Sequence, residues 1–294
     1  MKKLILSLAL GATSFLYANI NAVVSILPQQ TFLEKIGGDK VNITLMVQPG
    51  DSPHMYEPKP SQMKDISKAD IYFSLGVEFE DVWLEKLTNQ NKSMIVRSMS
   101  DNITRIAMVK HSHGEEENGH DEHDHDEHQD NTHDVKKDSH IWTTPANVKI
   151  MAQNIYNILS LMDRENEAYY KKNLTAFLKE IHNTDKTIKE LLSKIPTHSK
   201  FMVFHPAWGY FAKEYHLEQI AIESGGKNPK PKQIAHLIEE AKEEKVRAVF
   251  TAPEFSTKVA EQIAKEVGIP VVKMSSLDPK WSESMIKLAK NIAQ

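Results

Sequence analysis

The sequence predicts an α/β fold of two lobes, each a mainly parallel sheet flanked by helices, joined by one long helix. Its 294 residues are enough for two domains, each with a hydrophobic core of its own. Short apolar runs alternate with helical patterns in both halves, which is typical of parallel sheets covered by helices. Between the halves, apolar residues recur at helical spacing from Glu165 to Lys194, which corresponds to about 45 Å of helix.

The first half contains four short runs rich in apolar and β-branched residues, each bounded by Gly, Pro, Asp or Ser. They predict strands at Val23–Leu27, Val41–Val47, Ile71–Leu75 and Met94–Arg97. Helical patterns lie between them at Gln29–Ile36, Ser61–Ala69 and Phe79–Leu87. Pro145 then stands at a favourable first-turn position and predicts a helix that runs to about Met162.

After Pro196 the alternation of strands and helices resumes. The predicted strands are Phe201–Phe204, Leu217–Ile222, Ala248–Thr251 and Val271–Met274. The predicted helices are Ala207–Tyr215, Pro231–Lys245, Thr257–Val267 and Trp281–Ile292. We therefore expect an N-terminal lobe at residues 19–164, a linking helix at 165–195 and a C-terminal lobe at 196–294.

The N-terminus has the layout of a secretory signal peptide. Lys2 and Lys3 precede an apolar stretch, Leu4–Leu16, which is too short to span a bilayer comfortably, and a cleavage site follows at Ala18. We therefore predict a signal peptide at residues 1–18 and a mature protein in the periplasm. Because the chain contains no cysteine, we also expect it not to be lipid-anchored.

The composition excludes several functions. Without cysteine there can be no disulfide, thiolate metal site, iron–sulfur cluster or thiol nucleophile. The formal net charge of -4 argues against nucleic acid as a partner, because nucleic-acid binders normally present a basic face.

Residues 111–137 form an acidic, histidine-rich segment within the first lobe. From His111 to Asp134 there are seven histidines and ten carboxylates, with no Lys or Arg. Such a segment has too little apolar surface to order itself, so we expect a disordered loop. Either it is a solvated linker, or it gathers zinc through auxiliary sites at His111, His113, His120, His123, His125, His128 and His133. Its donors would also take Cu²⁺ and Ni²⁺, so it would not supply zinc selectivity.

Four further residues stand where a ligand site of an α/β protein is expected. His54, His205 and Asp278 follow predicted strands, and ligands of open α/β sheets bind beyond the carboxyl ends of the strands. His140 lies just before the helix predicted from Pro145. Three imidazoles and one carboxylate suit zinc. Taken one at a time, each histidine is equally consistent with a hydrogen-bonded surface residue, and the spacing alone does not decide.

Four segments resemble the signature segments of the solute-binding proteins of zinc and manganese ABC importers, and the histidine-rich stretch resembles the zinc-specific, ZnuA-type branch. The segments are Ser52–Ser61, Asp138–Trp142, Phe204–Phe211 and Leu277–Pro279. The resemblance covers essentially all of the mature chain, in the same order and spacing. It departs at Thr251-Ala252-Pro253, where the family often carries a Glu-Pro pair, so the contacts made there are left open.

The resemblance implies a metal site in a cleft between the two lobes. Carried over by position, the ligands would be His54, His140, His205 and Asp278, and a histidine at 205 resembles the zinc type. Zn²⁺ would be bound as transported substrate, and the partner would be an ABC-type zinc permease in the inner membrane. We expect a monomer that captures zinc and delivers it to this permease.

Other functions compete with this interpretation. A manganese- or iron-binding relative would share the fold, and a surface adhesin could be built on it. A zinc-dependent hydrolase needs an open metal position, which Asp278 as a fourth ligand would close. No metalloprotease helix motif is present, so we expect no enzyme activity.

Overall fold

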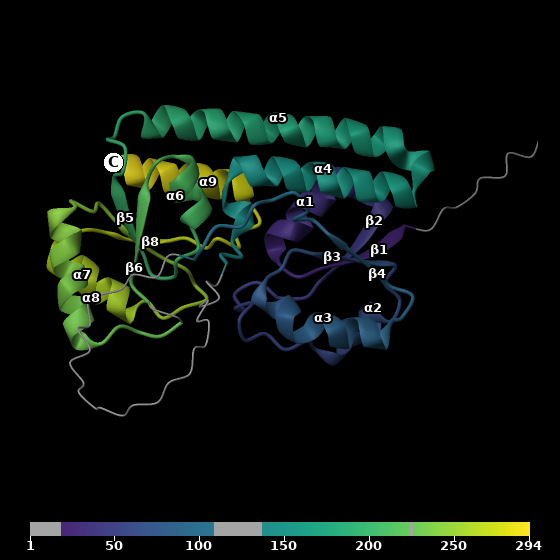
Figure 1. The fold of residues 1–294 in the computed structure, drawn as a ribbon, viewed down its shortest axis with the longest axis horizontal. Helices are drawn as coiled ribbons and strands as arrows, with labels where there is room; N and C mark the ends of the chain where they lie inside the picture. The colour runs from purple at the N-terminus through teal and green to yellow at the C-terminus, as the bar shows by residue number, and fades with distance from the viewer. Residues whose placement is uncertain (1–18, 109–136, 224–225) are drawn as a thin grey trace, which may run out of the picture.

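Two four-stranded sheets with the same strand order dominate the computed structural model, which describes residues 19–108, 137–223 and 226–294 (Figure 1). The first sheet has the order β2-β1-β3-β4 and contains β1 (Ile20–Val24), β2 (Val41–Leu45), β3 (Ile71–Ser74) and β4 (Ile95–Ser98). The second has the order β6-β5-β7-β8 and contains β5 (Lys200–Val203), β6 (Glu218–Ala221), β7 (Val249–Thr251) and β8 (Val271–Lys273). Every strand pair is parallel. The predicted two-lobed α/β fold is therefore confirmed.

Helices connect the strands within each lobe. The first lobe contains α1 (Leu27–Gly37), α2 (Pro60–Ile66) and α3 (Glu78–Gln90). The second contains α6 (Gly209–Glu214), α7 (Pro231–Glu243) and α8 (Lys258–Val267). In α1, α2 and α7 a glutamine in the first turn accepts a hydrogen bond from the backbone N–H of the residue just before the helix. These glutamines are Gln29, Gln62 and Gln233. Together with a proline in the same turn, this glutamine fixes where each helix begins.

A layer of three helices bridges the two lobes. In Figure 1, α5 (Glu167–Leu192) extends above both lobes, and α4 (Pro145–Met162) and α9 (Trp281–Ala293) lie beneath it. Helix α5 packs along both of them. Trp281 of α9 also meets Phe32 of the N-terminal lobe edge-on, with ring centroids 5.8 Å apart. The bridge is therefore more than the single long helix that the sequence predicts.

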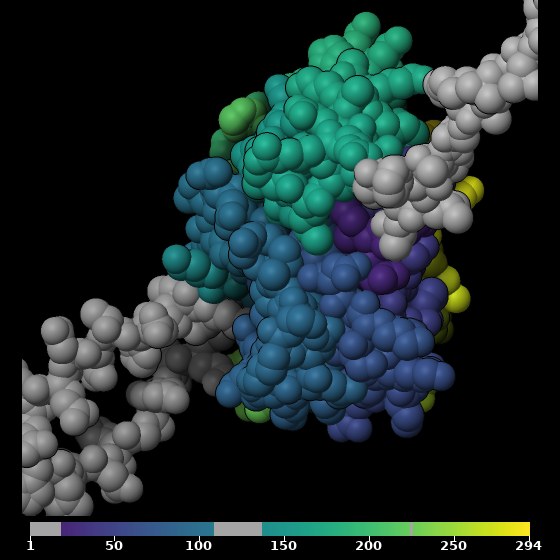
Figure 2. Space-filling view, turned by 90° about the vertical axis from the view of Figure 1, so that its right-hand side faces the viewer, coloured from purple at the N-terminus to yellow at the C-terminus, as the bar shows by residue number. Residues whose placement is uncertain are grey.

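Viewed from the side, the helical layer covers the N-terminal lobe from above. Figure 2 shows the teal helices on top of the blue and purple residues of that lobe. One hydrophobic core runs from the first sheet through α4 and α5 to α9, and a second core fills the far side of the C-terminal lobe. This continuous core fixes the two lobes on one helical support.

The regions outside the described residues include two of the predicted features. The signal peptide at 1–18 and the seven loop histidines from His111 to His133 both lie there. Ala107 and Lys137 pair as an antiparallel bridge, so the two described segments on either side of this gap have their ends close together. Among the described helices, none is both long and apolar enough to cross a membrane.

Candidate metal centre

A small cavity lies between the two lobes, at the ends of strands from both sheets. Its volume is about 40 Å³. The first lobe and the segment before α4 contribute His54, Glu78 and His140, and the second lobe contributes His205, Thr251, Glu254 and Ser275. His205 comes two residues after β5, where the strand order reverses between β5 and β7. This switch point is where open α/β sheets bind ligands.

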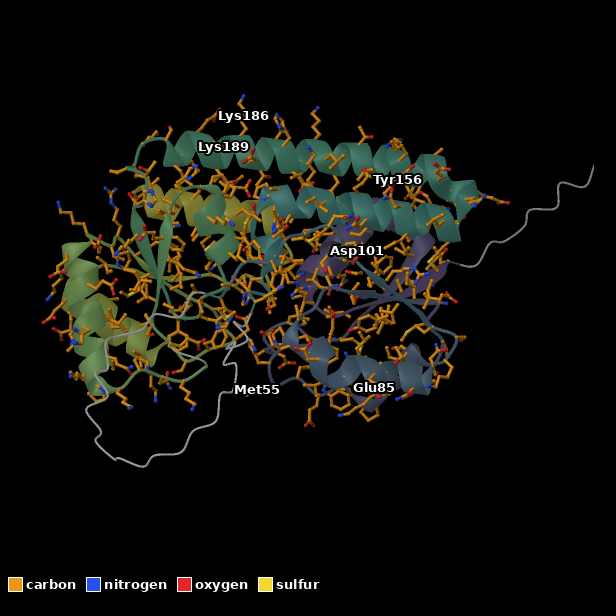
Figure 3. All side chains as sticks on the ribbon, in the orientation of Figure 1. Met55, Glu85, Asp101, Tyr156, Lys186 and Lys189 are labelled. Carbon is orange, nitrogen blue, oxygen red and sulfur yellow. The ribbon has the colours of Figure 1, made fainter. Side chains whose placement is uncertain are left out.

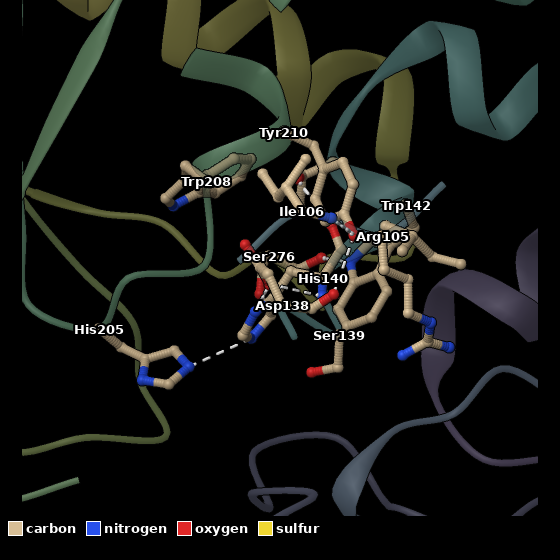
Figure 4. A network of polar contacts seen from close by, with 12 residues as sticks. Arg105, Ile106, Asp138, Ser139, His140, Trp142, His205, Trp208, Tyr210 and Ser276 are labelled. Atoms are coloured by element: carbon tan, nitrogen blue, oxygen red, sulfur yellow. Dashed lines mark hydrogen bonds and ion pairs between the residues drawn. The ribbon is translucent and has the colours of Figure 1, made fainter. Parts of the chain in front are cut away.

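His140 and His205 face each other across the cavity, one from each side of the lobe boundary (Figure 4). Their Nε2 atoms are 3.1 Å apart. Two imidazole nitrogens on one tetrahedral zinc ion are about 3.3 Å apart, since each Zn–N bond is about 2.0–2.1 Å. The pair therefore already has nearly the spacing that a shared zinc ion requires.

A buried carboxylate holds the other ring nitrogen of each histidine. Asp138 Oδ1 lies 2.8 Å from Nδ1 of His140, and Glu223 Oε1 lies 2.7 Å from Nδ1 of His205. A neutral ring whose Nδ1–H donates to its carboxylate keeps the Nε2 lone pair free for a metal ion. A proton or a metal ion between the two Nε2 atoms relieves the repulsion of two facing lone pairs. The arrangement can therefore hold a metal ion.

Burial favours the neutral form of the His205 ring. Burial lowers the pKa of His205 below its usual 6.5, Glu223 opposes this shift by favouring the charged ring, and His140 adds to it. A lowered pKa leaves the ring ready to bind a cation at neutral pH and somewhat below it.

His54 lies in the loop after β2, at the outer side of the cavity. Its ring centroid is 5.3 Å from that of His205, and its Nδ1 is 3.8 Å from Glu78 Oε2. The neighbouring Met55 is 82% exposed and lies at the lower edge of the molecule, between the lobes (Figure 3). In the described part of the chain, no three His, Asp or Glu side chains are already arranged around one metal position. The structure thus shows a preformed pair of imidazoles with a third imidazole beside it.

Asp278 is not among the residues that line the cavity. It lies in the loop after β8, where its Oδ1 accepts the backbone N–H of Lys280 at 2.8 Å. Its role as a ligand stays a prediction. Glu78 and Glu254 do line the cavity, although neither is among the metal ligands predicted from the sequence. Both follow the third strand of their lobe, and this position is the signal that could have revealed them.

The loop that carries His140 is fixed by the C-terminal lobe. Tyr210 of α6 donates to the carbonyl of Asp138 at 2.9 Å, and Trp142 Nε1 donates to the carbonyl of Ser276 at 2.7 Å (Figure 4). A Cβ atom at Gly209 would lie 2.7 Å from Asp138 Oδ2, so only glycine allows this close approach. The position of His140 therefore depends on contacts between the lobes.

A family model agrees with this geometry. The model of the zinc-uptake complex component A, periplasmic (ZnuA), matches residues 22–294. The chain belongs to the ZnuA family. It is therefore a substrate-binding protein of the metal ABC transporters.

Individual relatives and structures support the same assignment. The high-affinity zinc uptake system protein ZnuA of Bacillus subtilis is 30% identical and covers 91% of this chain and 82% of its own. The manganese ABC transporter substrate-binding lipoprotein scaA of Streptococcus gordonii is also 30% identical and covers 86% of this chain and 77% of its own. A crystal structure of ZnuA superposes with a TM-score of 0.81 at 37% identity, covering 94% of this chain and 98% of that one. The relatives include both zinc and manganese proteins.

The expected absence of a lipid anchor is wrong by these comparisons. The scaA protein and the zinc-binding lipoprotein AdcA of Streptococcus pneumoniae, 28% identical over 98% of this chain and 59% of AdcA, are both named lipoproteins. Lipoproteins are held at a membrane by their acyl chains. The expectation relied on a residue count, and a count does not show how proteins of this family are retained. The family name, a periplasmic component, agrees with a location outside the cytoplasm.

Proposed function

We propose that this ZnuA-family protein captures Zn²⁺ outside the cytoplasm and delivers it to an ABC-type membrane permease for import. One observation supports zinc above all. The Nε2 atoms of His140 and His205 are 3.1 Å apart, and each ring is backed by a buried carboxylate. This donor set favours a borderline ion such as zinc, whereas manganese prefers an oxygen-rich shell.

The proposed ligands are His54, His140, His205 and Asp278. His140 and His205 bind without rearrangement, while His54 joins by turning its partly exposed side chain away from Glu78. Asp278 joins when its loop, in which it now accepts the N–H of Lys280, shifts toward the two imidazoles. Zinc binding would thus draw groups from both lobes onto one preformed pair. The ZnuA deletion mutant whose structure is described as zinc bound has a TM-score of 0.80 to this chain at 37% identity.

The size of the cavity favours an ion over an organic substrate. A volume of about 40 Å³ holds a metal ion with roughly one or two water molecules. A peptide, ester or phosphate substrate does not fit beside an ion in that space. We therefore propose a binding protein rather than a zinc hydrolase.

Delivery follows from the way the site is divided between the lobes. His140 keeps its position through hydrogen bonds from Tyr210 and to Ser276. A permease that shifts one lobe relative to the other would break these contacts and separate His140 from His205. We infer that docking on the permease releases the ion in this manner, with a single chain as the delivering unit.

Zinc titration of the purified protein tests the proposal. We expect one tight site in the cavity, which the His140→Ala and His205→Ala variants each lose. Calorimetry with a competing chelator measures the affinity. The proposal fails if both variants bind zinc as tightly as the parent protein does.

A further inference from the structure

We propose that Thr251 and Glu254 form a water-binding subsite beside the zinc position. There, Glu254 Oε2 accepts a hydrogen bond from a water molecule that lies against the zinc site but is not one of the four ligands of the ion. This inference rests on the proposed zinc-binding function and adds a specific role for two residues outside the proposed ligand set.

Two buried polar atoms in the cavity wall carry the inference. Thr251 is 2% exposed, and its Oγ1 has no hydrogen-bond partner among the described residues. Glu254 Oε2 is also buried and has no partner there. Leaving such an atom unsatisfied is unfavourable, and more so for a charged group. Both residues line the cavity, and the proposed water molecule would satisfy both atoms.

The surrounding backbone fixes these two side chains. Thr251 is the last residue of β7, and its carbonyl accepts the N–H of Met274 at 2.6 Å. Glu254 lies in a turn that is closed by the N–H of Phe255 and the carbonyl of Ala252 at 3.1 Å. Both positions are therefore set by the end of the sheet.

Only one oxygen of Glu254 is left for a ligand. Ser275 Oγ donates to Glu254 Oε1 at 2.6 Å, which orients the carboxylate and leaves Oε2 for another donor. Phe255, the next residue, stacks on the ring of His205 with centroids 4.8 Å apart and planes at 21°. This stacking places the turn directly beside a proposed zinc ligand.

The available donors and space favour water over a second metal ion. One carboxylate oxygen and one hydroxyl are too few ligands for a divalent cation, which needs at least four. A water molecule needs about 10–15 Å³ and two to four polar partners. Thr251 Oγ1 and Glu254 Oε2 supply two, and the cavity of about 40 Å³ accommodates both water and ion.

The test compares the Glu254→Gln and Thr251→Val variants with Glu266→Gln, which removes the same charge from an exposed position of α8. We expect the zinc dissociation constant to rise about 10-fold or more for Glu254→Gln. Losses of this size are typical when a polar group just outside the ligands of a metal is changed. We expect a rise of a few-fold for Thr251→Val and none for Glu266→Gln. The visible absorption spectrum of the Co²⁺-loaded protein should shift in the first two variants only, because it reports the coordination shell.

The outcomes separate this inference from the function on which it rests. If the parent protein binds no zinc, the proposed function fails. If the parent binds zinc, but Thr251→Val and Glu254→Gln leave affinity and Co²⁺ spectrum unchanged, only the subsite is overturned. A zinc-loaded crystal structure with Glu254 Oε2 about 2.0–2.2 Å from the metal would also overturn it, since Glu254 would then be a direct ligand. Thr251→Val alone decides the matter if Glu254→Gln does not fold.

Discussion

The two lobes have the same strand order but use the carboxyl ends of their strands differently. In the N-terminal lobe the protein's own polar groups fill much of this region, although His54 and Glu78 reach the cavity. Glu80, which is 6% exposed, accepts the backbone N–H groups of Leu75 and Gly76 and the hydroxyl of Ser25. Ser25 Oγ is in turn 2.9 Å from the hydroxyl of Tyr72. All of these polar groups find partners within the lobe.

In the C-terminal lobe the equivalent region faces the cavity. His205 Nε2 points at His140, and the cavity-lining residues Thr251 and Glu254 each have a buried side-chain oxygen without a partner among the described residues. The difference shows how one fold separates stability from binding. Polar groups satisfied within the N-terminal lobe stabilise it, and polar groups without partners at the cavity of the C-terminal lobe are available for ligand binding.

The largest effect is expected for His205→Ala. Because this change removes one of the two preformed ligands, we expect zinc affinity to fall on the order of 1000-fold, about 4 kcal/mol. Chelator competition measures the affinity. The control is His236→Ala, which changes an exposed histidine of α7 in the same lobe. An equal loss of affinity in both variants would contradict the assignment of the site.

Glu80→Ala should instead reduce stability. The change leaves two buried backbone N–H groups and a hydroxyl without their acceptor, which lowers the free energy of unfolding by about 2–4 kcal/mol. Zinc affinity of the folded protein should stay within about threefold, because Glu80 does not line the cavity. Urea unfolding measures the stability. Glu85→Ala, at an exposed position of α3 (Figure 3), is the matched control. A large loss of zinc affinity in Glu80→Ala would contradict the assignment of Glu80 to stability alone.

Glu223→Gln tests the carboxylate behind His205. Glutamine keeps an oxygen acceptor but removes the charge, so we expect zinc affinity to fall about 10- to 100-fold. Glu223 also opposes the lowering of the His205 pKa, and its removal should lower this pKa further. The parent protein should therefore keep its zinc affinity down to and somewhat below pH 6.5, and the variant to still lower pH. Zinc titrations across this pH range check both statements. They are refuted if the variant keeps the zinc affinity of the parent and loses zinc at a higher pH than the parent does.

The smallest effect is expected where the lobes meet the helical layer. Glu214, at the end of α6, accepts the N–H of Ala146 in the first turn of α4 and lies near Asp185 and Lys189 of α5. Burial, with a smaller contribution from Asp185, raises its pKa to about 7, against the opposing effects of Ala146 and Lys189. The folded protein thus binds this proton more tightly than the unfolded chain, so its stability rises as pH falls from about 8 toward 4.5.

Glu214→Gln should remove this dependence. Because the side chain is only partly buried, we expect the variant to be more stable than the parent by about 1 kcal/mol at pH 8, and equally stable at pH 4.5. Urea unfolding at the two pH values measures this, with Glu243→Gln at an exposed position of α7 as the control. The same difference at both pH values would show that Glu214 does not titrate in this range.

Much of the fold can be predicted from sequence because the pattern is local. The helix predicted from Pro145 to Met162 has those bounds in the structure, since its proline start and apolar spacing both lie within the segment. The crossing of α9 onto the N-terminal lobe could not be predicted, because an amphipathic helix fits many grooves. Only the tertiary structure shows that Trp281 packs against Phe32.

The site is predictable to a similar extent. Strand ends identify His54 and His205, a predicted helix start identifies His140, and the structure brings all three to one cavity. The carboxylate partner of His205 could not be predicted, because Glu223 is 18 residues away and its approach depends on β5 and β6 being neighbours. The place of Glu254 in the cavity wall could not be predicted either, since it depends on how β7 and β8 end side by side.

Competition between Zn²⁺ and Mn²⁺ distinguishes a zinc site from a manganese site. The measurement uses a variant that lacks residues 112–134, so that the histidines of this segment do not contribute. The pair of imidazoles predicts one zinc ion per chain and a preference for zinc over manganese of more than about 100-fold, following the order of affinities of nitrogen ligands. Manganese that binds as tightly as zinc, or the absence of a tight zinc site, would contradict the proposed zinc-binding function.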